Sequence, residues 1–149
     1  MHNNKDITHL FASLQAGDRR SLARAITFCE SSKLEDQRVA SKLLSQAPRN
    51  MGTRRIGVCG APGVGKSTFI NALGQTLMSK GYRLAVLAID PSSPRSGGSI
   101  LGDKTRMPDL LNTDAFIRPT PSKGVLGGIA RHTHEAIALV EAAGYNLTI

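Results

Sequence analysis

The 149-residue sequence has no tryptophan, only 4% aromatic residues and two cysteines. So few aromatic side chains argue against the base-stacking platforms that hold single-stranded nucleic acid. Cys29 and Cys59 lie far apart and match no disulfide framework or zinc spacing, so we predict two reduced thiols in a cytoplasmic protein. No apolar run approaches the ~20 residues of a membrane span, and residues 1–20 lack the apolar core of a signal peptide, so we expect no membrane association.

Basic residues outnumber acidic ones by 19 to 11, which gives a formal net charge of +8. An excess of this size suggests an anionic partner, which can be a nucleic acid, a phosphate group or an acidic protein surface. We expect no specific nucleic-acid partner, and steeply salt-dependent DNA binding would be the sign of one.

Residues 1–50 are predicted to form a helical N-terminal extension. Apolar residues recur at helical spacing in three stretches, which are separated by Gly17-Asp18 and Ser31-Ser32 and end near Pro48. The apolar positions of these stretches are Leu10, Phe11, Leu14, Leu22, Ala25, Ile26, Cys29, Val39, Leu43 and Leu44. We interpret the extension as a packing element, with a docking surface for a partner as the alternative.

Residues 51–149 alternate between short apolar runs and amphipathic stretches, the order typical of an α/β fold. Strands are predicted at 56–59, 83–89, 115–118 and 146–149. The nearly continuous apolar run at 83–89 indicates a parallel sheet that is covered on both faces. Pro119 and Pro121 are expected to stop the third strand.

Two helices are predicted in this second part. One ends at Gly81, and its inward positions are Phe69, Ile70, Leu73 and Leu77. The other runs from about 125 to 143, and its apolar face comprises Ile129, Ala136, Ile137 and Val140. His132 and His134 are two residues apart and cannot share a helix face, so we expect no metal site there.

The strongest motif is GAPGVGKS, Gly60 to Ser67, which matches G-x-x-x-x-G-K-[ST] between a predicted strand and a predicted helix. Its glycines allow backbone N–H groups to turn inward and surround phosphate oxygens, and the helix N-terminus adds its dipole. We expect Lys66 to reach the β- and γ-phosphates and the Ser67 hydroxyl to coordinate Mg²⁺.

Two acidic residues follow the motif. Asp90 ends the second strand at the carboxyl edge of the sheet, where ligands bind in open α/β folds, and Asp103 lies in a Gly-Asp-Lys sequence. Each can approach Mg²⁺ or its waters, or can instead be a cap or turn acid. The glycine-rich loop at 92–106 has the length of a functional loop and would suit a switch that responds to the γ-phosphate. Four basic residues either line the phosphate side or are solvated: Lys104, Arg106, Arg118 and Lys123.

The stretch 90–107, DPSSPRSGGSILGDKTRM, resembles the methylmalonyl-CoA mutase-associated GTPases (MeaB/ArgK-like, also described as lysine/arginine/ornithine transport system ATPases). GAPGVGKSTFINALG, AVLAIDP, AFIRPTPSKGVLGGIARHTHEAI and EAAGYNLTI resemble the same family in the same order. The resemblance implies a P-loop NTPase of SIMIBI type, a three-layer α/β/α fold with a mostly parallel sheet. It also implies a helical extension at 1–50 before an incomplete GTPase domain at 51–149.

The resemblance implies slow GTP hydrolysis with Mg²⁺ by a homodimeric chaperone for an adenosylcobalamin-dependent acyl-CoA mutase. Lys66 and Asp103 would be catalytic, Ser67, Asp90 and Asp103 would surround the metal, and Ser99–Arg106 would form the first switch. The residues implied to hold the phosphates are Gly60, Ala61, Pro62, Gly63, Val64, Gly65, Lys66, Ser67 and Thr68.

The sequence also departs from the family's pattern. It contains neither the V-G-x-G-Q turn of the second switch nor the N-K-x-D motif that reads guanine, so the preference for GTP rests on the resemblance alone. We therefore expect a truncated N-terminal half that is weakly active or inactive. Two alternatives are a P-loop ATPase or kinase linked to lysine/arginine/ornithine transport and a non-enzymatic nucleotide-binding fragment.

Overall fold

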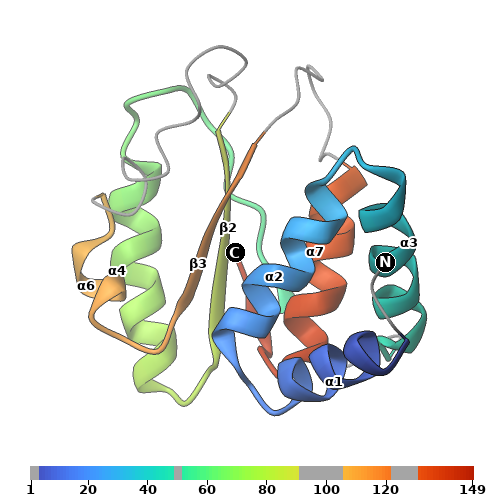
Figure 1. Cartoon of the computed structure of the whole chain (residues 1–149). Coiled ribbons are helices and arrows are strands. Elements are labelled where there is room, and N and C mark those ends of the chain that lie inside the picture. The colour runs from blue at the N-terminus through green and yellow to red at the C-terminus, as the bar shows by residue number, and fades with distance from the viewer. Residues whose placement is uncertain (1–3, 49–51, 91–105, 122–130) are drawn as a thin grey trace. The chain divides into compact units, whose positions relative to one another are not determined.

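The computed structural model describes residues 4–48, 52–90, 106–121 and 131–149. These residues sort into two compact units (Figure 1). One is helical and comprises residues 4–48 with 131–144, and the other holds the sheet and comprises residues 53–90, 106–121 and 145–149. Asp103, Lys104, Lys123 and the loop at 92–105 lie outside the described residues.

The helical unit contains α1 (Asn4–Gln15), α2 (Arg19–Glu30), α3 (Leu34–Gln46) and α7 (Arg131–Ala142). All the apolar positions predicted in residues 1–50 are buried, except Leu44, which is half-buried. The breaks also lie where expected, because Gly17 has a φ of 87° and Asp18 caps α2 by accepting from the Ser21 amide at 2.9 Å. The helical periodicity of residues 4–48 was therefore enough to predict three helices and their buried faces.

Helix α7 packs against α2 and α3, although it begins 85 residues after the end of α3 in the sequence. Ala136 and Val140 are fully buried as predicted, and Ile137 is half-buried. The helix is described from residue 131, so Ile129 and the predicted first turns lie outside the described residues. Gly144, with a φ of 84°, follows the helix end.

The sheet unit has four parallel strands in the order β1-β4-β2-β3. They are β1 (Arg54–Arg55), β2 (Leu84–Asp90), β3 (Phe116–Pro121) and β4 (Leu147–Thr148). Helices α4 (Lys66–Ser79) and α6 (Pro108–Leu111) cover one face (Figure 1). The buried core between them comprises Leu84, Val86, Met107, Leu110, Ala115, Ile117 and Leu147.

The strand predicted at 56–59 was wrong, because β1 comprises only Arg54 and Arg55. Its ladder with β4 ends at the pair Arg55 and Thr148, and the amide of Ile56 makes the last bond, 2.8 Å to the Thr148 carbonyl. The partner strand β4 ends at residue 148, so residues 57–59 have no strand beside them in the described part of this chain. An apolar run becomes a strand only where another strand pairs with it.

The prediction that Pro119 stops the third strand was wrong, because β3 continues through Pro119 and ends at Pro121. Among the described strands β3 is an edge strand and pairs only with β2. The two prolines are two residues apart, so their nitrogens point to the same side of the strand. An edge strand needs ladder donors on one side only, and proline is tolerated where its nitrogen faces the open side.

The face of α4 was also predicted with one error, since Phe69 is 56% exposed. Ile70, Leu73 and Leu77 are half-buried as expected, and Gly74 is the fully buried residue of the helix. Phe69 precedes Gly74 by five positions and therefore lies about 140° around the helix from that buried glycine. The short helix α6 was not predicted at all.

Candidate nucleotide-binding site

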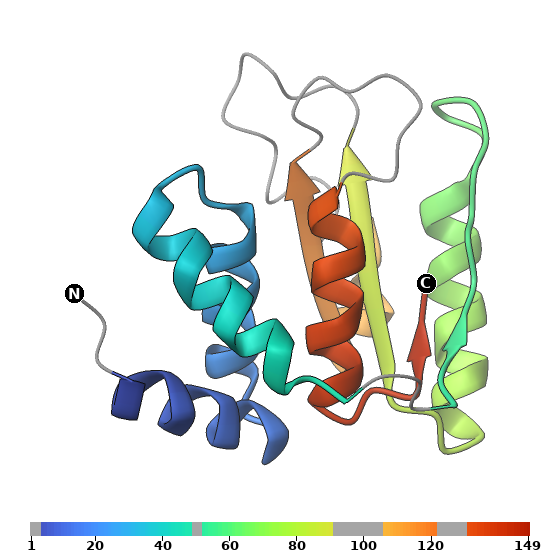
Figure 2. The ribbon, with the colours of Figure 1, turned by 90° about the vertical axis from the view of Figure 1, so that its right-hand side faces the viewer.

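The phosphate-loop motif connects the β1 side of the sheet to α4 at the end where β2 and β3 also terminate (Figure 2). Gly63 and Gly65 have φ angles of 80° and 93°, in the left-handed region that side chains with a Cβ rarely adopt. Residues other than glycine would be strained in this backbone conformation. In loops of this kind, successive backbone N–H groups point into the concave side of the loop, where an anion can bind.

Among the described residues, no side chain caps the backbone N–H groups at the N-terminus of α4. The N-cap residue of this helix is Gly65. Lys66, Ser67 and Thr68 form the first turn, which contains no acidic residue. Free N–H groups and the positive end of the helix dipole together favour an anion such as phosphate.

The Lys66 ammonium folds back over the loop. Its Nζ donates to the carbonyls of Gly60 and Ala61, both at 2.8 Å. An ammonium has three donors, so one remains for a phosphate oxygen while the two carbonyls hold the charge over the loop. The role of Lys66 toward the phosphates stays a prediction.

A magnesium site is only partly described. Ser67 is half-buried in the first turn of α4, and Asp90 ends β2 at the same end of the sheet. The described residues contain no group of three candidate metal ligands, whereas the Asp90 side chain and all of Asp103 lie outside them. A hydroxyl and carboxylates are the oxygen ligands that Mg²⁺ prefers, so the residues present fit this ion.

The remaining candidates contribute less. Arg106 is exposed just before α6, and Arg118 is half-buried on β3 opposite Leu87. His132 Nδ1 lies 3.3 Å from a Glu135 carboxylate oxygen, whereas His134 is exposed. Among the residues that the structure describes, the two histidines belong to no group of three candidate metal ligands.

A residue that the sequence reasoning missed is Asn71 on α4. Its side chain makes two hydrogen bonds to α6. The Nδ2 of Asn71 donates to the Asp109 carboxylate at 2.6 Å, and the Oδ1 accepts from the backbone amide of Leu110 at 3.2 Å. The sequence did contain a sign of this role. Asn71 is a polar residue four positions after Ser67, so it lies on the same side of the helix, among apolar residues.

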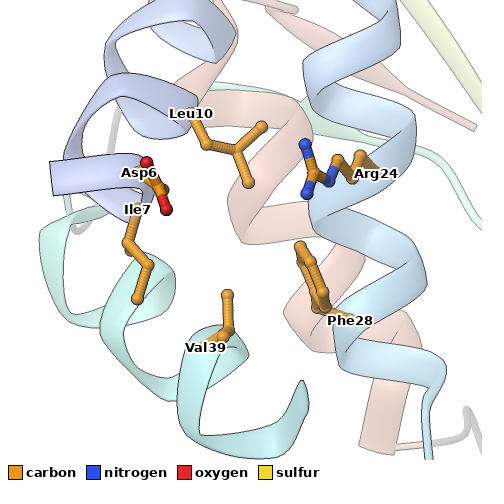
Figure 3. A pocket seen from close by; sticks show the side chains of 6 residues that line it. All are labelled: Asp6, Ile7, Leu10, Arg24, Phe28 and Val39. Carbon is orange, nitrogen blue, oxygen red and sulfur yellow. The ribbon is translucent and has the colours of Figure 1, made fainter. Parts of the chain in front are cut away.

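The helical unit contains a small cavity of about 30 Å³ between α1, α2 and α3 (Figure 3). It is lined by Asp6, Ile7, Leu10, Arg24, Phe28 and Val39. At the border of this cavity, the Arg24 guanidinium carbon lies 5.7 Å from the centre of the Phe28 ring. A space of this size admits about one water and no nucleotide, so it is not a second ligand site.

The two cysteines are free thiols in different environments. Cys59 is exposed just before Gly60, whereas Cys29 is buried in the helical unit. Burial, with Glu135 and Glu30 nearby, raises the pKa of Cys29 to about 12. The raised pKa makes the Cys29 thiol a poor nucleophile at neutral pH. None of the helices in the described ranges is long and apolar enough to cross a bilayer.

A parallel sheet with a glycine-rich phosphate loop leading into a helix defines the class of P-loop NTPases. A solved structure described as an LAO/AO transport system kinase has this fold too. Its TM-score is 0.78 and its sequence identity is 34%, and the match covers 100% of this chain and 43% of the other. The sequence-family model of the methylmalonyl-CoA mutase-associated GTPase MeaB matches residues 22–149 of this chain. The chain therefore belongs to that family.

Named relatives agree with this assignment. A Caulobacter vibrioides protein that bears the name of a GTPase is 55% identical over 97% of this chain. The GTPase ArgK of Escherichia coli is 47% identical over 100% of it, and the mitochondrial methylmalonic aciduria type A homolog of Mus musculus is 46% identical over 96%. This chain spans 45%, 46% and 37% of the lengths of these three proteins.

Proposed function

We propose that this chain binds GTP through residues 60–68 and contributes to GTP hydrolysis in assistance of an adenosylcobalamin-dependent acyl-CoA mutase. The observation that carries the proposal is the Lys66 ammonium, held at 2.8 Å by two loop carbonyls beside an uncapped helix N-terminus. This arrangement suits the β- and γ-phosphates of a nucleoside triphosphate, because backbone N–H groups and one cation lie together at the N-terminal end of α4.

Each residue of the site has a distinct task in this proposal. The N–H groups of the loop and of the first turn of α4 donate to phosphate oxygens, and Lys66 neutralises charge on the γ-phosphate. The Ser67 hydroxyl, with Asp90 and Asp103, would hold Mg²⁺, which supplies further charge neutralisation when bound. Asp103 is also the carboxylate that we propose as a catalytic residue in hydrolysis.

The assignment to a mutase chaperone is supported by the family, which is named for its association with methylmalonyl-CoA mutase. Homodimer formation and a cytoplasmic location belong to the same proposal.

An ATP-dependent function is the second candidate, because the solved structure with the same fold is named as a transport system kinase. Competition distinguishes the two. A fluorescent GDP bound with Mg²⁺ to a full-length version of the protein that also carries the N-K-x-D motif is displaced by unlabelled GTP or ATP. We expect GTP to displace it at lower concentration, and equal displacement by ATP would contradict the preference for guanine.

Lys66→Ala tests the phosphate site itself. We expect the affinity for GTP to fall about a hundredfold, because hydrogen bonds from a charged donor are lost while the loop keeps its glycines. The matched control is Lys80→Ala, which removes an exposed lysine at the other end of the same helix and should leave the affinity unchanged. Unaltered GTP binding by the Lys66 variant would refute the proposed site.

A further inference from the structure

Two arginines at the amino end of the sheet each lie across a tyrosine ring. The guanidinium carbon of Arg54, at the start of β1, is 5.4 Å from the centre of the Tyr82 ring. The guanidinium carbon of Arg83, which directly precedes β2, is 5.2 Å from the centre of the Tyr145 ring. A cation over an aromatic face is attracted by the electrons of the ring. The rings therefore hold the two guanidinium groups in place, although both arginines are exposed.

Asn146 places the two arginines beside each other. Its backbone carbonyl accepts from the amide of Arg54 at 3.0 Å, and its Oδ1 accepts from the amide of Arg83 at 2.9 Å. Asn146 directly precedes β4, which pairs with β1 on one side and with β2 on the other. Two strand spacings therefore separate the Cα atoms of the arginines, a distance of about 10 Å. We call Arg54, Tyr82, Arg83 and Tyr145 the arginine–tyrosine cluster.

The polar groups that the cluster offers to a ligand are donors. The Nη1 of Arg54 donates to the Tyr82 hydroxyl oxygen at 2.6 Å. Because this oxygen accepts, the hydroxyl hydrogen and the other guanidinium N–H groups of Arg54 can donate to a ligand. Within the described part of the chain, the Arg83 guanidinium lies over its ring and has no side-chain acceptor. A ligand that matches the cluster is therefore rich in acceptors.

Positive charge surrounds the cluster. Arg55 is exposed next to Arg54 on β1. Among the described residues within two positions of the first residue of each strand, the acidic one is Asp114. It precedes β3, which is at the opposite edge of the sheet from β1. Guanidinium groups pair with carboxylates through two parallel hydrogen bonds, so the charge and the donors favour the same kind of ligand.

Two other anionic partners fit the cluster less well. A second copy of this chain carries the same net charge of +8, so two copies repel each other. Single-stranded nucleic acid is held by bases that stack on aromatic faces. Here a guanidinium covers a face of each ring, and Tyr145 is only 4% exposed. The side chains of aspartate and glutamate need no such face.

We infer that the arginine–tyrosine cluster is a docking surface for a segment of a partner protein that is rich in aspartate and glutamate. The cluster lies at the end of the sheet away from the phosphate loop (Figure 2). Helix α4 has 14 residues and is about 21 Å long, and Tyr82 and Arg83 follow its far end. A partner docked there leaves residues 60–68 open, so the inference does not depend on the proposed function.

The test uses a fluorescein-labelled oligoglutamate peptide, titrated with the chain at near-physiological salt and followed by fluorescence anisotropy. A labelled peptide of glycine and serine with the same length reports binding that needs no carboxylate. Labelled single-stranded DNA of the same total charge reports binding of phosphates. Circular dichroism shows whether each variant keeps its fold, which we expect because the substituted side chains are exposed.

Three double variants separate geometry from charge. We expect Arg54→Gln with Arg83→Gln to weaken binding of oligoglutamate about tenfold, because charge-assisted hydrogen bonds are lost. Lys5→Gln with Arg38→Gln removes two exposed cations from α1 and α3 and should weaken it less than about twofold. Arg54→Lys with Arg83→Lys keeps the charge but loses the planar fork, and should weaken binding about fivefold.

Several results would overturn the inference. It fails if the unaltered chain does not bind oligoglutamate, or binds the peptide of glycine and serine equally well. Equal losses in the two glutamine variants, or full affinity in the lysine variant, would show that net charge alone governs binding. Tighter binding of DNA that is lost in the Arg54 and Arg83 variants would assign the cluster to nucleic acid instead. Should the glutamine variant at Arg54 and Arg83 not fold, the lysine variant decides, since it keeps both cations.

Discussion

The helical unit and the sheet unit bury their apolar residues by different routes. In residues 4–48 the apolar positions recur every three or four residues, and almost all of them are buried. In the sheet unit, large apolar side chains beside the phosphate loop remain exposed, among them Val64 at 66% and Phe69 at 56%. The comparison shows that side-chain packing organises the first unit, whereas apolar side chains around the phosphate loop of the second unit take little part in packing.

The largest contrast should appear in the reactivity of the two thiols. At pH 8, a pKa of about 12 leaves about one Cys29 in ten thousand as thiolate, whereas Cys59 is exposed. We expect iodoacetamide to label Cys59 at least about a thousand times faster than Cys29 in the native chain, and both equally in urea. Mass spectrometry of timed samples measures the two rates. Rapid native labelling of Cys29 would mean that the helical unit opens readily.

The packed core of the helical unit should show the next effect. Leu22 is fully buried on α2, so Leu22→Ala removes buried carbons and leaves a cavity, and we expect the free energy of unfolding to fall by about 2–5 kcal/mol. Leu34→Ala is the control, because Leu34 is 73% exposed and should change stability by no more than about 0.5 kcal/mol. Urea denaturation followed by circular dichroism measures both. Similar losses in the two variants would contradict the burial pattern.

The contact between α4 and α6 tests packing in the sheet unit. Gly74→Ala inserts a methyl group where three side-chain carbons lie closer than 3.0 Å, and we expect a loss of about 1–3 kcal/mol from overpacking. Gly57→Ala is the matched control, since a Cβ there meets nothing within 4 Å. The same urea titrations apply, and a neutral Gly74→Ala would show that α6 moves away from α4 without cost.

The smallest effect is expected at an exposed helix cap. The Ser21 hydroxyl and amide hydrogen-bond to Asp18 and lower the pKa of its carboxyl below the usual 3.8. A lowered pKa in the folded chain contributes stability that is present above about pH 4 and is lost as the pH falls through the lowered value. Asp18→Ala should therefore lower the urea midpoint at pH 7 and much less at pH 2. A pH-independent difference would contradict the role of the ionised cap, and Asp114→Ala, at an exposed acid, is the control.

The parts that could be predicted depend on short-range order. Periodicity located α1, α2 and α3, an apolar run located β2, and the spacing from Gly60 to Ser67 located the phosphate loop, because in each case neighbouring residues determine the outcome. The strand at 56–59 and the end of β3 were wrong, since they depend on strands about thirty residues away or more. Propensity cannot show whether a partner strand is present or which strand lies at the edge.

The amino-acid sequence by itself determined the class of this protein, because the phosphate-loop motif between strand and helix needs no distant residue to be recognised. Only the tertiary structure showed that Asn71 and Gly74 hold α6, and that Lys66 already rests on two loop carbonyls. The physical reason is the range of the interactions: Asn71 and Leu110 are thirty-nine residues apart in the sequence, and folding alone brings an amide oxygen on one helix to an uncapped amide on another.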